Sequence, residues 1–95
     1  MPPLDSLPHS LARSPQIETS DIGDRVVLYH SESGKSLVLN PLGTWLWRLM
    51  AAPMTTEDLA ARVQAQYPTV DAESARRDVE TYLYTLTEHG ALQQN

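Results

Sequence analysis

The side chains most able to do chemistry stand far apart in this sequence. His9, His30 and His89 lack the close spacing of metal ligands. The chain has no cysteine, which excludes a thiolate nucleophile, a disulfide bond and a cysteine-based metal site. The four glycines are isolated and do not form a phosphate-binding loop. We therefore expect no catalysis, no cofactor and no metal ion.

The charged residues are better explained by helix structure than by a reaction. Glu57 and Asp58 fall at the start of a predicted helix, where carboxylates favour the helix dipole. Arg76 and Arg77 could contact phosphate, but acidic residues adjoin them, so we interpret them as part of a solvated helix face. The net charge is −5, and no segment is strongly basic. Charge therefore argues against non-specific nucleic-acid binding, which depends on neutralising phosphates.

Length and composition predict one small domain. The chain has 95 residues, of which 41% are hydrophobic. Residues 1–14 contain scattered proline and serine without periodicity and are predicted to be a disordered tail, so the folded domain is expected at 15–95. The N-terminus lacks a signal-peptide pattern, and no stretch approaches the ~20 apolar residues of a membrane span. We therefore expect a cytoplasmic protein without a membrane partner.

Residues rich in β-branched and aromatic side chains predict an antiparallel sheet of three strands. The clearest strand is RVVLYH at 25–30, and a shorter strand at 16–22 precedes it across the turn DIGD. The turn SESG at 31–34 has hairpin length, so 35–39 is predicted to return as the third strand. Two of three strands must be sheet edges with unpaired backbone groups, and such an edge can bind an extended peptide.

The dipeptide Asn40-Pro41 is predicted to join the third strand directly to a first helix. Asparagine is a good N-cap, and proline fits the first helical position, where its missing N–H costs nothing. The apolar stripe of this helix leaves Trp47 away from its centre, so Trp47→Ala is expected to cost less stability than Trp45→Ala. The stripe consists of Leu42, Trp45, Leu46, Leu49 and Met50.

Two further amphipathic helices complete the predicted core. The second is capped by Thr55 or Thr56, the third begins after Asp71, and Gly90 follows the third helix at its C′ position. The predicted fold class is α+β, with a three-stranded antiparallel sheet followed by three helices. The predicted apolar stripes are Leu59, Ala60, Val63 and Tyr67 in the second helix, and Ala72, Ala75, Val79, Tyr82, Leu83 and Leu86 in the third.

From about residue 24 to 92 the chain resembles the PqqD-like family. These are recognition elements for the precursors of ribosomally synthesised, post-translationally modified peptides. The resemblance rests on the segments VVLYHSESGKSLVLNPLGTWLWRLM, TTEDLAARVQAQYP and DVETYLYTLTEHGAL. It is strongest to the stand-alone elements of lasso-peptide clusters, and it implies a winged-helix-like fold.

The resemblance implies that a leader peptide adds antiparallel to the third strand, in a groove floored by the third helix. Asp78 could pair with a basic leader residue, or it could be a solvated carboxylate. The residues alone leave open which border of the third helix lines the groove, and the place of Asp78 in the resembling motif favours its own border. The predicted peptide-binding residues are Lys35, Ser36, Leu37, Val38, Leu39, Ala75, Asp78, Val79 and Tyr82.

Three functions fit these elements. The leading hypothesis is a non-catalytic module that binds a leader peptide and presents it to a tailoring enzyme or leader peptidase. The first alternative is a winged-helix DNA-binding transcription regulator, although the acidic segment 71–95 argues against a DNA recognition helix. The second is an assembly subunit with a different partner.

Overall fold

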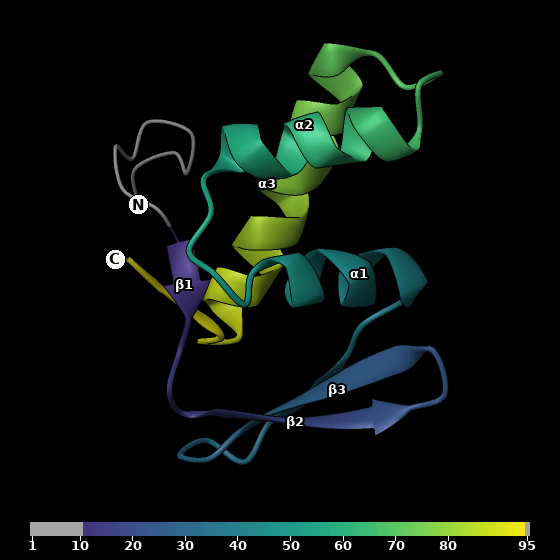
Figure 1. The fold of residues 1–95 in the computed structure, drawn as a ribbon. Coiled ribbons are helices and arrows are strands. Elements are labelled where there is room, and N and C mark those ends of the chain that lie inside the picture. The colour runs from purple at the N-terminus through teal and green to yellow at the C-terminus, as the bar shows by residue number, and fades with distance from the viewer. Residues whose placement is uncertain (1–10, 95) are drawn as a thin grey trace.

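The computed structural model describes residues 11–94, and within them five strands and three helices follow one another (Figure 1). Four strands come first, then the three helices, then a last short strand. The elements are β1 (Leu11–Arg13), β2 (Ile17–Ile22), β3 (Arg25–His30), β4 (Ser36–Val38), α1 (Pro41–Leu49), α2 (Thr56–Gln66), α3 (Ala72–Glu88) and β5 (Leu92–Gln94).

The predicted three-stranded sheet is confirmed. β2, β3 and β4 pair antiparallel in that order, so β2 and β4 are its two edges. Val26, Leu28 and Leu39 are buried on the face that α1 covers. Figure 1 shows α1 lying across the sheet, with α2 on the far side of α1 and α3 running past both helices toward the sheet. This arrangement is compatible with the predicted likeness to winged-helix proteins, which stays a prediction.

The joint between sheet and helices has the predicted construction. Asn40 Oδ1 accepts a hydrogen bond from Gly43 N at 2.7 Å, and Pro41 is the first residue of α1. α2 begins with a capping box, in which Thr55 and Asp58 each accept a hydrogen bond from the other's backbone N–H at 3.1 Å. Two residues therefore suffice to turn the chain from β4 into α1, which leaves no flexible loop between them.

Both ends of α3 are also as predicted. Asp71 is its N-cap, and Gly90 has a φ of +80°, which glycine adopts without strain. Gly90 N donates to Thr87 O at 3.0 Å and Ala91 N donates to Leu86 O at 2.9 Å, which is the Schellman pattern of hydrogen bonds. This turn places Ala91 in the core with no exposed surface.

β1 and β5 form a second sheet, which the sequence analysis did not predict. They pair antiparallel, and Leu11 exchanges backbone hydrogen bonds with Met54 at 2.9 and 3.1 Å. Leu11 is 4% exposed. The predicted tail is therefore wrong for residues 11–14, because contacts with distant segments order a stretch too short to show a pattern. The prediction for residues 1–10 lies outside the described residues.

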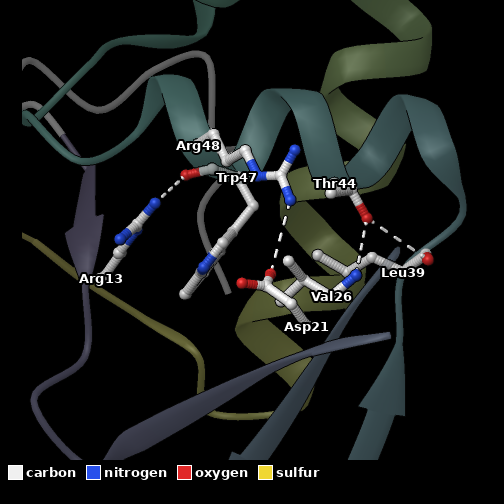
Figure 2. Close-up of polar contacts among 7 residues, drawn as sticks. All are labelled: Arg13, Asp21, Val26, Leu39, Thr44, Trp47 and Arg48. Carbon is white, nitrogen blue, oxygen red and sulfur yellow. Dashed lines mark hydrogen bonds and ion pairs between the residues drawn. The ribbon is translucent and has the colours of Figure 1, made fainter. Parts of the chain in front are cut away.

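Arg13 ties β1 to the first helix. Its guanidinium carbon lies 4.6 Å from the centroid of the Trp47 ring, and its Nη2 donates to Trp47 O (Figure 2). Burial lowers the pKa of Arg13 from its ordinary value. An exposed ion pair joins Arg48 of α1 to Asp21 of β2 at 3.4 Å and contributes little to stability (Figure 2).

The helical phase predicted for α1 is wrong. Trp47 is 2% exposed, whereas Trp45 is only partly buried and Leu42 is 38% exposed. The core-facing side includes Gly43 and Thr44, which an apolar stripe does not identify. Gly43 allows the close approach of Tyr82, and Thr44 supplies a hydroxyl group that forms hydrogen bonds. The buried residues of this helix and its C-cap are Gly43, Thr44, Leu46, Trp47 and Met50.

The stripes predicted for α2 and α3 are confirmed except near the helix ends. Tyr67 follows the end of α2 and is 44% exposed, and Ala72 is exposed in the first turn of α3. Tyr82 is partly buried against the core. The buried residues are Leu59, Ala60 and Val63 in α2, and Ala75, Val79, Leu83 and Leu86 in α3.

We predict that Trp47→Ala lowers the free energy of unfolding by about 3–5 kcal/mol, the usual cost of removing a buried large aromatic side chain. Trp45→Ala should cost clearly less, because Trp45 keeps part of its surface in water. Urea denaturation followed by circular dichroism measures both values. An equal or larger cost for Trp45→Ala would contradict this assignment of the buried face.

Candidate functional site

The hydrogen bonds between β3 and β4 determine which amides of the edge strand remain free. Leu39 N donates to Val26 O at 2.9 Å, and at the other end His30 N donates to Lys35 O at 2.9 Å. Bonded positions alternate along an antiparallel ladder, so every second amide of β4 faces away from β3. The outward amides are those of Ser36 and Val38.

The two edges of the sheet differ in charge. β2 carries the exposed carboxylates Glu18 and Asp21, whereas β4 has no charged residue between Ser36 and Val38. Charged side chains on an edge strand oppose pairing with another strand. β4 is therefore the edge better suited to receive a guest strand.

A groove lies between β4 and the C-terminal half of α3, and we call it the strand groove. Its volume is about 170 Å³. Val38 on its strand side is 56% exposed, and Leu37 is partly buried. The lining residues are Leu37, Val38 and Leu39 from the strand side, Tyr82, Thr85 and Leu86 from α3, and Asn40 and Gly43 from the joint.

A second hollow adjoins the strand groove where α1 faces α3, and we call it the helix cavity. Its volume is about 260 Å³. The lining residues are Asn40, Leu42, Gly43 and Leu46 from the joint and α1, Val63 from α2, and Asp78, Val79, Thr81 and Tyr82 from α3. Most of these side chains are apolar, so the helix cavity favours apolar groups.

The structure brings most of the predicted site residues to this face. Tyr82 lines both hollows, whereas Asp78 and Val79 line only the helix cavity. The border of α3 that faces β4 and α1 is thus the one that the sequence favoured. Ala75 is the exception, because it is fully buried, lines neither hollow and cannot reach a peptide. The placement of β4 is as predicted, with Lys35 and Ser36 exposed and Leu37, Val38 and Leu39 in the strand groove.

Sequence reasoning missed several lining residues. Leu86 was placed on the same stripe as Tyr82 but was not assigned to the site, and Thr85 follows Tyr82 by three positions, so helical periodicity alone could have placed it on that face. Leu42 was assigned to the core, but it is 38% exposed and lines the helix cavity. Gly43 belongs to the first segment that carries the family resemblance, but its role depends on Tyr82 of α3 and is visible only in the structure.

Thr44 holds α1 against the end of the β3–β4 ladder (Figure 2). Val26 N donates to Thr44 Oγ1 at 3.0 Å, and the Thr44 hydroxyl donates to Leu39 O at 3.5 Å. Thr44 is 1% exposed, so solvent water does not compete for these hydrogen bonds. These contacts set the position of α1 relative to the end of the candidate binding edge.

Tyr82 spans the space between α3 and the start of α1. Its hydroxyl donates to Gly43 O at 2.7 Å, and burial raises the pKa of Tyr82, so the hydroxyl keeps its proton. A Cβ atom on residue 43 would lie 3.1 Å from Tyr82 Cε1 and 3.2 Å from Asn40 Oδ1. Glycine at position 43 therefore lets the Tyr82 ring pack closely against the joint.

His30 and His89, far apart in sequence, meet at the end of β3. Their ring centroids lie 6.4 Å apart in an edge-to-face arrangement. His30 Nδ1 accepts from the amides of Glu32 at 3.2 Å and Ser33 at 3.3 Å, which shapes the turn before β4. Across residues 11–94, no three histidine or acidic side chains gather as metal ligands. None of the helices described is both long and apolar enough to span a bilayer.

Comparisons with known proteins agree with this architecture. A family described as coenzyme PQQ synthesis protein D (PqqD) matches residues 25–92. No curated protein sequence is significantly similar to the chain. Among solved structures, "TbiB1 in Complex with the TbiA(beta) Leader Peptide" is 27% identical, with a TM-score of 0.79 over 86% of this chain and 94% of that one. "Lasso peptide synthetase B1 complexed with the leader peptide" is 21% identical, with a TM-score of 0.77 over 88% of this chain and 98% of that one, and shows the shared fold.

We predict that Thr44→Val destabilises the protein by about 1–3 kcal/mol, because the buried amide of Val26 loses its acceptor while the shape of the side chain is kept. Thr44→Ser, which keeps the hydroxyl, is the matched control and should cost less. Denaturant titration measures both free energies, and hydrogen exchange of the Val26 amide reports the bond directly. Thr44→Val at parental stability would show that the hydroxyl is dispensable.

Proposed function

The chain belongs to the PqqD family, and on that premise we propose that it is a non-catalytic module that binds the leader segment of a ribosomally synthesised, post-translationally modified precursor peptide. The family match covers β3, β4, all three helices and the start of β5. The observation that carries the proposal is the edge of β4, which pairs with no second strand among residues 11–94 and whose outward amides stand beside the strand groove. Both similar structures are complexes with a leader peptide.

The leader adds to the sheet as a fourth strand, antiparallel to β4. The amides of Ser36 and Val38 donate to its carbonyl groups, and its alternate side chains enter the strand groove over Tyr82 and Leu86. This keeps all the predicted peptide-binding residues except Ala75, which is buried. Asp78 lines the helix cavity and is exposed, so it remains available to a basic leader residue.

The binding edge is held in place before the leader arrives. Asn40 caps α1 directly after the edge strand, and Thr44 joins that helix to Val26 and Leu39. A preformed edge loses little conformational entropy when the peptide binds. The affinity for the leader therefore does not have to offset the ordering of a loop.

The second partner is a tailoring enzyme or leader peptidase of the same pathway, to which this module presents the bound precursor. The likeness to a lasso peptide synthetase B1 supports a pathway of that type. The precursor is made on ribosomes, so we place the module in the cytoplasm. In this role the module supplies binding and orientation, and the partner supplies the chemistry.

The DNA-binding alternative has no support in the comparisons, and the charges of α3 argue against it. Arg76 forms ion pairs with Glu57 and with Glu80, the latter at 3.5 Å, and Arg77 lies 3.4 Å from Glu73. Arginines engaged with neighbouring carboxylates are poorly placed to neutralise phosphates.

We predict that Ser36→Pro weakens leader binding at least tenfold while the protein stays folded, because proline removes an outward amide and leaves the bonds to β3 intact. The probes are synthetic, fluorescently labelled leader segments of the precursor peptides encoded beside this gene, and fluorescence anisotropy measures the dissociation constant. Circular dichroism checks the fold of each variant.

Two further proline variants control this experiment. Ser31 N donates to Gln16 O at 3.0 Å, so by alternation the amide of Thr19 faces outward on the opposite edge, and Thr19→Pro should leave leader binding unchanged. Leu37→Pro removes an amide that faces β3 and should damage the sheet itself. Parental affinity in Ser36→Pro would rule out strand addition at β4.

A further inference from the structure

The strand groove and the helix cavity meet at one side chain. Both are lined by Asn40, Gly43 and Tyr82, and within residues 11–94 they share no other lining residue. Asn40 is the N-cap of α1 and Gly43 lies in its first turn, and both contribute little side-chain bulk between the hollows. Tyr82 is therefore the large group that separates them.

The Tyr82 ring is held at both ends. Its Cα belongs to α3, and its hydroxyl donates to Gly43 O in α1 at 2.7 Å. The ring lies so close to Gly43 that a Cβ there would stand 3.1 Å from Tyr82 Cε1. A ring anchored on two helices cannot swing aside without breaking a half-buried hydrogen bond.

Each hollow has room for one side chain of ordinary size. A cavity of about 150 Å³ holds a benzene molecule. The strand groove, at about 170 Å³, is close to that size, and the helix cavity is about 260 Å³. Only if Tyr82 were absent would the two hollows form one continuous space for a much larger group.

We propose that Tyr82 is a specificity-determining partition, which makes the protein select leader peptides with two separate apolar anchor residues and limits the anchor in the strand groove to moderate size. One anchor enters the strand groove and the other enters the helix cavity. This inference rests on the proposed function, and it adds which leader side chains are accepted and which residue limits their size. Tyr82 acts as a positioning residue that shapes the site.

The test uses a displayed library of random 12-residue peptides and does not require the natural leader. The library is selected against the parent protein, against Tyr82→Ala, and against the control Tyr84→Ala. Tyr84 belongs to the same helix, is 52% exposed and lines neither hollow. We expect the parent and Tyr84→Ala to enrich peptides with two separate apolar anchors, of which at least one is no larger than phenylalanine, and Tyr82→Ala to enrich tryptophan at that anchor.

Affinity measurements then quantify the shift. The consensus peptide is synthesised with leucine or with tryptophan at each anchor, and fluorescence anisotropy gives the ratio of the two dissociation constants. Relative to the parent, Tyr82→Ala should change that ratio about tenfold in favour of tryptophan, and Tyr84→Ala should not change it. A general loss of stability would weaken both peptides alike and leave the ratio unchanged.

Tyr82→Phe keeps the test decisive if Tyr82→Ala fails to fold. It retains the ring but removes the hydrogen bond to Gly43, so it should shift the ratio in the same direction by a smaller factor. If the parent enriches no peptide and also fails to bind the labelled leader segments, the proposed function fails and this inference fails with it. If the parent enriches peptides but the ratio is the same in every folded variant, the partition is wrong and the proposed function stands.

Discussion

The arrangement of the candidate site depends on a buried hydroxyl at the place where the sheet meets the first helix. The ladder between β3 and β4 ends at Val26 and Leu39, and there the Val26 amide donates to Thr44 Oγ1 at 3.0 Å. A buried amide without an acceptor would cost about 1–3 kcal/mol. This requirement holds α1 against the last pair of the sheet, and α1 in turn supplies one wall of the helix cavity. The candidate site is thus built around a polar contact inside an apolar core.

That constraint explains how so small a domain can hold the candidate binding edge rigidly. β4 has only three residues, yet β3 holds one side of it, and Asn40 and Thr44 hold the point where it becomes α1. The opposite edge, β2, is longer but carries carboxylates, which oppose strand addition. Of the two edges of the three-stranded sheet, β4 is therefore the one better suited to receive a strand, and it lies beside apolar hollows that can take side chains.

Most of the fold could be predicted from local patterns. Asn40-Pro41, the capping box at Thr55 and the turn at Gly90 each depend on residues close together in the chain, and the structure has all three. The edge strand followed from the same patterns, whereas the peptide-binding residues of α3 were implied by the family resemblance. Of these, Tyr82 lines the strand groove, but Ala75 shares the helical periodicity of the others and is fully buried in the core.

The sequence by itself determined the strands of the main sheet, the three helices, their caps and the direct joint between β4 and α1, because each results from interactions within a few residues. Only the tertiary structure decided which side of α1 is buried, since Trp47 packs under Arg13 of β1 and Thr44 finds its partners in β3 and at Leu39. It also decided that residues 11–13 form a strand, because β5 and Met54 supply the hydrogen bonds. The role of Gly43 also depends on the tertiary structure, because Gly43 is needed only where the Tyr82 ring of α3 packs against it. Such contacts join residues distant in the chain, and their energies depend on a packing that no local pattern records.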